Sequence, residues 1–169
     1  VTLHPNTNQI GVGAFMGCTA LAQVIGVEDT SFVSMGDGAF YGTKIDALEC
    51  FNDATVKKFV SAFNTYTVRF ETYGLVNVAS KEVVQGDSLT SLPVADDPGG
   101  YTFVDWALDK ELTDIVTASD MPYKVEGNIT IYAIYEYTVT FETGVDEVTV
   151  NPVTAEAGKT FPEPAAPVR

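Results

Sequence analysis

The chain has 169 residues, of which 46% are hydrophobic and 11% aromatic, so it can bury a core and is not a disordered tail. Its formal net charge is −14, and its 9 Lys and Arg are scattered, which argues against the clustered positive charge of a nucleic-acid-binding surface. The same charge would repel an anionic membrane surface, and no stretch reaches the length of a membrane span. We therefore expect no nucleic-acid partner and no membrane insertion.

A short repeat occupies the first part of the chain. Residues 10–17 (Ile-Gly-Val-Gly-Ala-Phe-Met-Gly) return as residues 35–42 (Met-Gly-Asp-Gly-Ala-Phe-Tyr-Gly), and a short apolar run follows each copy. A coil of this length cannot cover its own apolar edge, so the coils must stack, with Ala-Phe supplying one small and one large interior side chain. The repeat predicts stacked coils over residues 1–50.

This repeat resembles the leucine-rich repeats of the BspA type, found in bacterial surface proteins, whose units read roughly Ile-Gly-x-x-Ala-Phe-x-Gly-Cys-x-x-Leu. The first copy continues the match through Cys18 and Leu21, whereas the second has Thr43 in place of the cysteine. The resemblance implies the C-terminal end of a longer solenoid that binds proteins through an extended surface. The candidate binding residues are the side chains expected to be exposed there, namely Gln23, Glu28 and Lys44.

The apolar period changes after residue 50. Four apolar side chains recur at i, i+3, i+4 and i+7, which are Val56, Phe59, Val60 and Phe63. This spacing predicts one face of a helix, with Asn52 or Asp53 accepting a backbone N–H at its start. We expect the helix to cap the solenoid within residues 51–65, with a hinge at Asn64-Thr65.

A second, longer repeat follows the predicted helix. Residues 66–72 (Tyr-Thr-Val-Arg-Phe-Glu-Thr) return 71 residues later as residues 137–143 (Tyr-Thr-Val-Thr-Phe-Glu-Thr). Gly86 and the three residues after it are answered by Gly158 and its followers, with one residue gained. A period of this length indicates a duplicated module, and tandem duplication builds arrays rather than active sites.

Within the first copy, apolar and polar side chains alternate as in a half-buried strand. The alternation begins at Tyr66, and further strands are expected around residues 76–84, 101–106 and 129–135. We expect the single Trp106 at the centre of the small core that these strands enclose.

Three separated motifs in residues 66–136 resemble the Listeria–Bacteroides repeat, also called the internalin B-repeat. They lie at residues 66–74, 100–106 and 128–133, with departures at the turn around Tyr73 and at Asp105 before the tryptophan. The resemblance implies a small β-grasp-like module and a secreted or wall-attached bacterial protein.

No linker separates this module from its second copy. Apolar side chains occupy odd positions without a break from Ile129 to Phe141, so we predict that the last strand of one module continues into the first strand of the next. The combined strand would span roughly 50 Å and stiffen the junction, whereas a hinge at Glu136 would contradict this idea. Residues 137–169 form an incomplete second copy, and we expect the chain to be a fragment of a longer array. Pairing of the open half with another chain is the alternative to a monomer.

The predicted fold is mainly β with minor α. It consists of a short leucine-rich repeat solenoid end over residues 1–50, a capping helix and hinge over residues 51–65, a β-grasp-like module over residues 66–136, and the incomplete copy over residues 137–169.

The residue types give no sign of catalysis, so we expect a non-enzymatic chain without a cofactor. The one histidine, His4, lies near the N-terminus, and Cys18 and Cys50 lack metal-ligand spacing. A weak Ca²⁺ site at Asp96-Asp97 stays open, although acidic turns of this kind are ordinarily only turns. A disulfide between the two cysteines also stays open beside the reading of both as small buried hydrophobes.

The leading hypothesis is a segment of a bacterial secreted or cell-surface protein. The solenoid would recognise a host or bacterial surface protein in adhesion, and the β modules would act as a stiff spacer. The alternatives are a carbohydrate-binding module, whose tyrosines and Trp106 would stack on sugar rings, and an accessory region of a large secreted enzyme.

Overall fold

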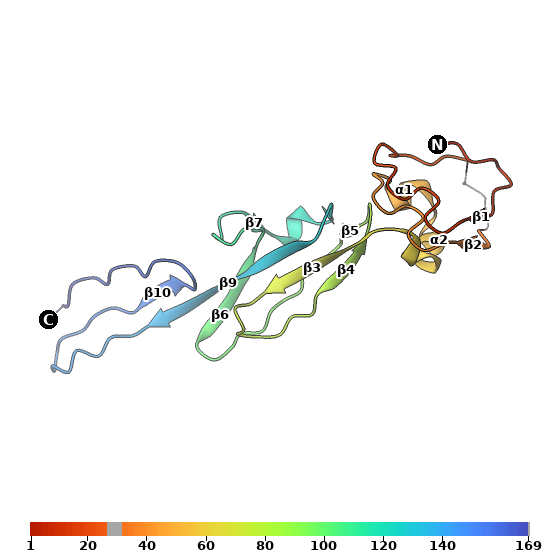
Figure 1. The fold of residues 1–169 in the computed structure, drawn as a ribbon. Helices are drawn as coiled ribbons and strands as arrows, with labels where there is room; N and C mark the ends of the chain where they lie inside the picture. Colours follow the sequence, from red (N-terminus) through yellow and green to blue (C-terminus); the bar gives the residue numbers. More distant parts are fainter. Residues whose placement is uncertain (27–31, 169) are drawn as a thin grey trace. The chain divides into compact units, whose positions relative to one another are not determined.

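The computed structural model describes residues 1–26 and 32–168, which form two compact units (Figure 1). Unit 1 comprises Val1–Arg69, Ser80–Ser91 and Met121–Ile129, and unit 2 comprises Phe70–Ala79, Leu92–Asp120 and Thr130–Arg169. The structure is mainly β with few short helices, as predicted. The boundaries expected at residues 50, 65 and 136 stay a prediction.

Unit 1 begins with turns that stack on one another. Strand β1 (Gln9–Ile10) pairs in parallel with β2 (Ser34–Met35), which lies at the offset of the short repeat. Beyond β1, the N–H groups of Gly13, Phe15 and Gly17 each donate to the carbonyl 24 residues further on (13 to 37, 15 to 39 and 17 to 41), at 2.8–3.1 Å. The repeat is therefore expressed as a ladder of backbone hydrogen bonds between successive turns.

An aromatic stack runs through these turns. The ring of Phe40 lies parallel to Phe15 at a centroid distance of 5.3 Å and to Phe63 at 5.4 Å, with interplanar angles of 12° and 6°. Phe40 and Ala39 are fully buried, as the repeated Ala-Phe pair predicts. The first copy differs, because Phe15 is only half-buried and Ala14 is exposed.

Two short helices and a 3₁₀ turn follow. Helix α1 (Ala47–Cys50) begins after Asp46, and α2 (Asp53–Lys58) begins after Asn52, whose side chain accepts a hydrogen bond from the Thr55 N–H at 2.9 Å. The predicted helix and its Asn52 cap are thus confirmed. Helix α1 is absent from the predictions because four residues are too short to show a helical period.

The predicted helical face is wrong at its far end. The chain leaves α2 at Lys58 and continues as the 3₁₀ helix η1 (Val60–Ala62), in which 3.0 rather than 3.6 residues complete a turn. The tighter winding turns Val60 outward, where it is 43% exposed, and buries Ala62 instead.

The first repeat module opens with a hairpin. Strand β3 (Thr65–Glu71) pairs antiparallel with β4 (Lys81–Val84), and β5 (Ser88–Leu89) pairs with β8 (Tyr123–Lys124). Val68 is fully buried and Phe70 nearly so, which confirms the predicted alternation. The strand expected over residues 76–84 exists only as β4, because the chain first turns at Thr72, whose carbonyl accepts from the Leu75 N–H.

Unit 2 is organised around one long strand. Strand β9 (Ile129–Val139) pairs antiparallel with both β6 (Tyr101–Ala107) and β10 (Val153–Glu156). It passes through Glu136 without interruption, as predicted for the junction between the two copies. Its 11 residues correspond to about 36 Å, less than the expected span. The short strand β7 (Ile115–Val116) pairs with β6, and the 3₁₀ helix η2 (Ala118–Asp120) follows it.

A β-bulge in β6 changes the phase of burial along β9. Phe103 lies opposite Tyr135, but Asp105 lies opposite Ile134, so Val104 is the extra residue. Side chains on both faces of β9 are buried at this point, since Tyr135 is fully buried and Ile134 is only 4% exposed. Period-two alternation alone does not predict an inserted residue of this kind.

Trp106 lies at the centre of the module core, as predicted. It is 1% exposed, and its ring lies 5.1 Å from Phe70 and 5.2 Å from Phe103. Its Nε1–H donates to the carbonyl of Pro93 at 2.7 Å, so the indole satisfies its polar group while buried.

The duplicated phrase has the same strand register in both copies. Tyr66 pairs with Val83 in the first hairpin, and Tyr137 pairs with Ala155 in the second, which corresponds to shifts of 71 and 72 residues. The one-residue gain seen in the sequence therefore lies in the loop between the two strands. Phe141, the counterpart of Phe70, is half-buried and meets Phe161 at 6.4 Å rather than a tryptophan.

Replacing Phe70 with Ala should lower the free energy of unfolding by about 3–5 kcal/mol, because it leaves a cavity against Trp106. The matched substitution Phe141→Ala should cost about 1 kcal/mol, because its ring is only partly buried. Urea unfolding followed by Trp106 fluorescence measures both variants. Equal losses would contradict the view that the second copy lacks a closed core.

Candidate functional site

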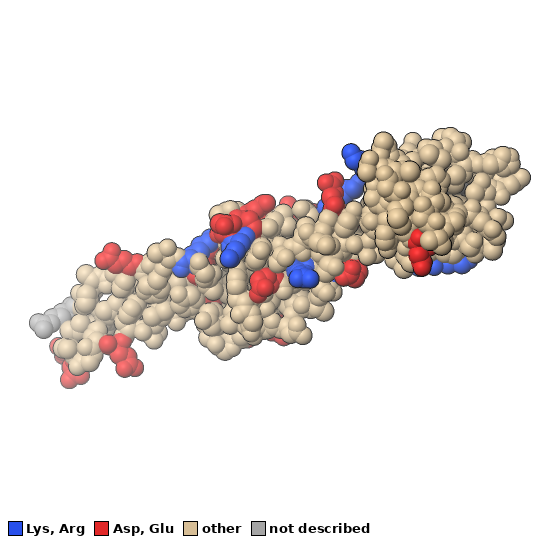
Figure 2. All heavy atoms as spheres, in the orientation of Figure 1, with Lys and Arg blue, Asp and Glu red and all other residues tan. Residues whose placement is uncertain are grey.

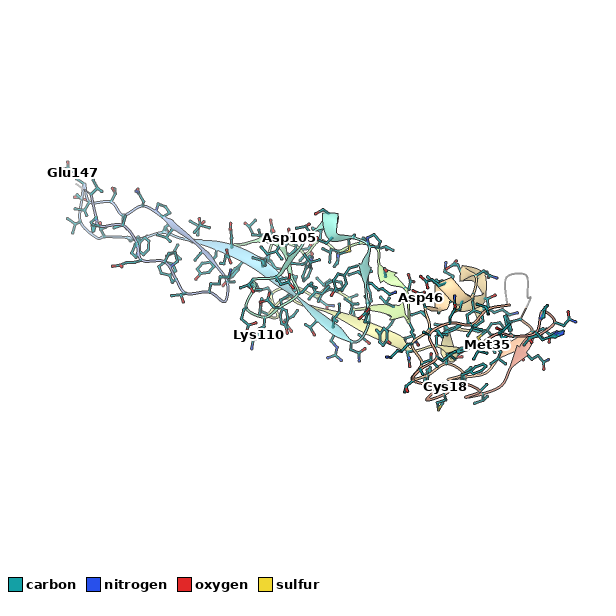
Figure 3. The ribbon with its side chains drawn as sticks, turned by 90° about the horizontal axis from the view of Figure 1, so that it is seen from above. Cys18, Met35, Asp46, Asp105, Lys110 and Glu147 are labelled. Carbon is teal, nitrogen blue, oxygen red and sulfur yellow. The ribbon has the colours of Figure 1, made fainter. Side chains whose placement is uncertain are left out.

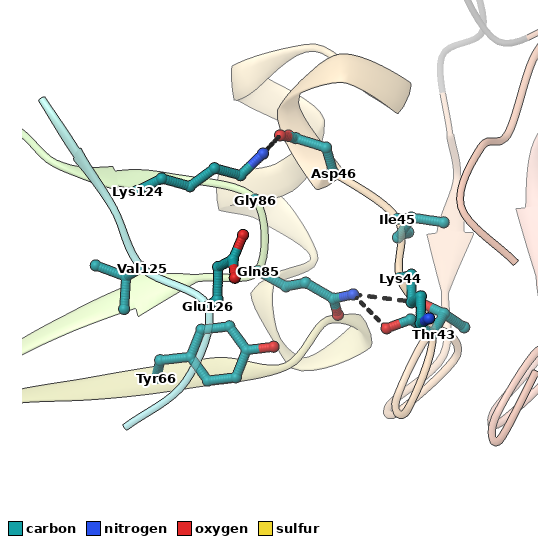
Figure 4. Close-up of a pocket in the computed structure, with 10 residues that line it drawn as sticks. All are labelled: Thr43, Lys44, Ile45, Asp46, Tyr66, Gln85, Gly86, Lys124, Val125 and Glu126. Carbon is teal, nitrogen blue, oxygen red and sulfur yellow. Dashed lines mark hydrogen bonds and ion pairs between the residues drawn. The ribbon is translucent and has the colours of Figure 1, made fainter. Parts of the chain in front are cut away.

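A cleft of about 390 Å³ opens within unit 1, where the turns meet the first hairpin (Figure 4). Three segments form it: the chain leading into α1, the hairpin β3–β4, and the strand end after β8. The lining residues are Thr43, Lys44, Ile45, Asp46, Tyr66, Gln85, Gly86, Lys124, Val125 and Glu126.

Gln85 forms the inner wall of this cleft and is only 5% exposed. Its Nε2 donates to the carbonyl of Thr43 at 2.7 Å, and its Oε1 accepts from Nδ2 of Asn64 at 2.7 Å. Its backbone N–H donates to the Asn64 carbonyl at 2.8 Å, and its own carbonyl accepts from the Ala47 N–H at 3.1 Å. Asn64, where the sequence predicts a hinge, is therefore held at both its backbone and its side chain.

Gly86 brings the hairpin against the start of α1. Its φ is +89°, which favours glycine, and a Cβ added there would lie 2.6 Å from the Cα of Asp46. Only a residue without a side chain fits this approach, so the glycine fixes how closely the hairpin and the turns pack.

Asp46 has two roles in the cleft. Its Oδ1 accepts from the N–H groups of Leu48 and Glu49 at 3.2 Å, which caps α1. Its Oδ2 pairs with the Lys124 ammonium at 3.1 Å. This hydrogen bond and the carboxylate charge raise the pKa of Lys124, so the pair persists through neutral pH and would be lost only as the pH rises beyond the ordinary range of lysine.

Three polar groups of the lining have no side-chain hydrogen bond to any described residue: the Lys44 ammonium, the Tyr66 hydroxyl and the Glu126 carboxylate. The lining contains two lysines, an aspartate and a glutamate, so its formal charge is balanced. The cleft therefore offers hydrogen bonds without a net charge. Within residues 1–26 and 32–168, no group of three or more His, Cys, Asp or Glu could hold a metal ion.

The predicted binding residues are only partly brought together. Lys44 is exposed and lines the cleft, whereas Gln23 is exposed elsewhere, and its carbonyl accepts from the N-terminus of Val1 at 2.8 Å. Glu28 lies outside the described residues. Asp46, Gln85 and Lys124 were not predicted, although the spacing of Asp46 and Glu49 resembles a helix-capping pattern.

The other sequence candidates are accounted for by local structure. Cys18, labelled in Figure 3, is exposed, and Cys50 is buried; both are free thiols. Burial raises the pKa of the Cys50 thiol, which accepts a hydrogen bond from the Val24 N–H at 3.3 Å. In the proposed calcium turn, the Asp97 carboxylate accepts from the Phe103 N–H at 2.7 Å, as in an ordinary turn.

Comparison with known proteins assigns the central part of the chain. Residues 66–134 match the family model of the Listeria-Bacteroides repeat domain. This match confirms the resemblance predicted for the module. It does not extend to residues 1–65, for which the leucine-rich resemblance stays a prediction.

Two curated relatives come from Evansella cellulosilytica. One, named "Putative membrane protein", is 38% identical over 110 residues, which cover 62% of this chain and 16% of the relative. The other, named "Putative Gly-rich membrane protein", is 35% identical over 107 residues, which cover 62% of this chain and 12% of the relative. The chain thus spans a small part of either relative. No solved structure gives a significant match.

Among the described residues, no helix has both the length and the apolar character needed to cross a membrane. The longest α-helix, α2, has six residues.

Replacing Gly86 with Ala should lower the free energy of unfolding by about 3 kcal/mol or more, because a left-handed backbone and a clash with Asp46 add together. Gly158→Ala is the matched control: its φ is +87°, but nothing lies within 4 Å of an added Cβ. It should cost about 1 kcal/mol. Far-UV circular dichroism in urea measures both, and similar losses would show that the approach to Asp46 is not tight.

Proposed function

We propose that this chain is a non-enzymatic segment of a bacterial secreted or cell-surface protein, in which residues 1–50 recognise another protein and the repeat modules act as a spacer. The observation that carries the proposal is the combination of a Listeria-Bacteroides repeat at residues 66–134 with stacked turns that expose an apolar surface.

The spacer role is supported by the way the two copies are joined. The second hairpin repeats the register of the first, and β9 supplies a strand to both copies without a break at Glu136. A continuous, hydrogen-bonded strand resists bending better than a flexible linker does. The printed names of the two relatives, both membrane proteins, are consistent with a place at the cell surface.

The recognition role is supported by the surface of the stacked turns. Their 24-residue hydrogen-bond ladder and their Phe15, Phe40 and Phe63 stack favour the leucine-rich repeat interpretation of residues 1–50. Figure 2 shows few charged atoms on the visible face of the part that holds β1 and β2.

The same turns expose large apolar side chains. Val12 is 79% exposed and Met16 55%, and Tyr41 in the next turn is 40% exposed. Exposed apolar side chains gathered on an uncharged surface favour a protein partner. By contrast, Trp106 is buried and hydrogen-bonded, so it does not provide the aromatic platform that the carbohydrate-binding alternative assigned to it.

The test is binding of the purified chain to a panel of host matrix proteins and mucins at physiological salt. We expect saturable binding to one protein, weakened by roughly fivefold or more in Val12→Asp, because a charge would then be buried in the interface. Val94→Asp is the control, since Val94 is 86% exposed in unit 2. Absence of saturable binding across the panel, or equal effects of both variants, would contradict recognition by the turns.

A further inference from the structure

We propose that the cleft of Figure 4 is a binding site for a neutral saccharide, with Tyr66 as the aromatic contact for a pyranose ring. This site is separate from the apolar surface of the turns, so the inference goes beyond the recognition of a protein.

The size of the cleft fits a small ligand. Its volume of about 390 Å³ lies in the range of small-molecule pockets, which is roughly 300–1,000 Å³, and leaves room for a mono- or disaccharide. The walls are fixed before a ligand arrives, because Gln85 bonds to Thr43, Asn64 and Ala47, and Gly86 packs against Asp46. A preformed pocket loses less conformational entropy on binding.

The free groups of the lining suit hydroxyl ligands. A sugar hydroxyl both donates and accepts, and the cleft offers a donor at Lys44, an acceptor at Glu126 and a group of both kinds at the Tyr66 hydroxyl. Figure 4 shows the Tyr66 hydroxyl pointing toward the segment that carries Thr43 and Lys44. The half-buried Tyr66 ring adds an apolar surface against which the C–H face of a pyranose can pack.

The charge of the lining selects against ionic ligands. Lys44 and Lys124 are balanced by Asp46 and Glu126, and Lys124 is already paired with Asp46 at 3.1 Å. An anion or a cation would have to break this balance, since the like charge in the lining would face it. A neutral polyol gains hydrogen bonds from all four side chains without that penalty.

The experiment is a titration of the ¹⁵N-labelled chain with neutral pyranoses (glucose, galactose, mannose and N-acetylglucosamine) and with charged glucuronate and glucosamine. We expect saturable amide shifts for Lys44, Gly86 and Glu126 with at least one neutral sugar, and dissociation constants at least tenfold weaker for the charged sugars. The absence of saturable shifts up to about 50 mM for every neutral sugar would overturn the proposal.

Two tyrosine variants separate binding from folding. Tyr66→Ala should abolish the shifts, whereas Tyr137→Ala changes the equivalent residue of the second copy, which lies outside this cleft, and should leave them intact. An unchanged amide spectrum of unit 1 outside the lining shows that Tyr66→Ala still folds, and Tyr66→Phe, which keeps the ring, should retain weakened binding. Equal loss in the Ala variants of Tyr66 and Tyr137, or undiminished binding in Tyr66→Ala, would overturn the site. Because no protein partner is present, failure here leaves the recognition by the turns unaffected.

Discussion

The amide of Gln85 is the interaction on which unit 1 depends. This side chain comes from the repeat module, yet its hydrogen bonds reach Thr43 in the turns and Asn64 before the first strand. Because it is 5% exposed, loss of the amide would leave the Thr43 carbonyl and the Asn64 side chain without these partners, at a cost of about 1–3 kcal/mol each. The turns and the hairpin are thus parts of one folded body, and the cleft exists because that body is rigid.

Duplication copied the backbone of this joint but not its side chains. In the second copy, the N–H of Ala157 donates to the Tyr135 carbonyl at 2.7 Å, as Gln85 donates to Asn64 at 2.8 Å, and the following glycine has nearly the same φ. Ala157 has no amide to reach a neighbour, and nothing lies close to Gly158. The hairpin is therefore a general feature of the repeat, whereas the cleft is particular to the copy that follows the turns.

The sequence predicts those features that repeat or alternate. The phrase beginning at Tyr66, the buried Trp106, the continuous strand through Glu136 and the Asn52 cap could all be predicted, because each depends on local periodicity or on a capping residue. Ile134 and Val60 were assigned wrongly, since a bulge and a 3₁₀ turn each shift the period by a fraction of a turn. The cleft itself could not be predicted, because Asp46, Gln85 and Lys124 are far apart in the chain and meet only through tertiary packing. Lys44 is the one predicted binding residue that lines it.

Hydrogen exchange of the Ala47 amide tests this account most directly. That N–H donates to the Gln85 carbonyl, whereas the Phe40 N–H donates to Ala62 within the turns. If the turns and the hairpin form one cooperative body, the free energies of opening from both amides should agree within about 1 kcal/mol. Fast exchange at Ala47 while Phe40 stays protected would show that the hairpin separates from the turns, and the account built on Gln85 would be wrong.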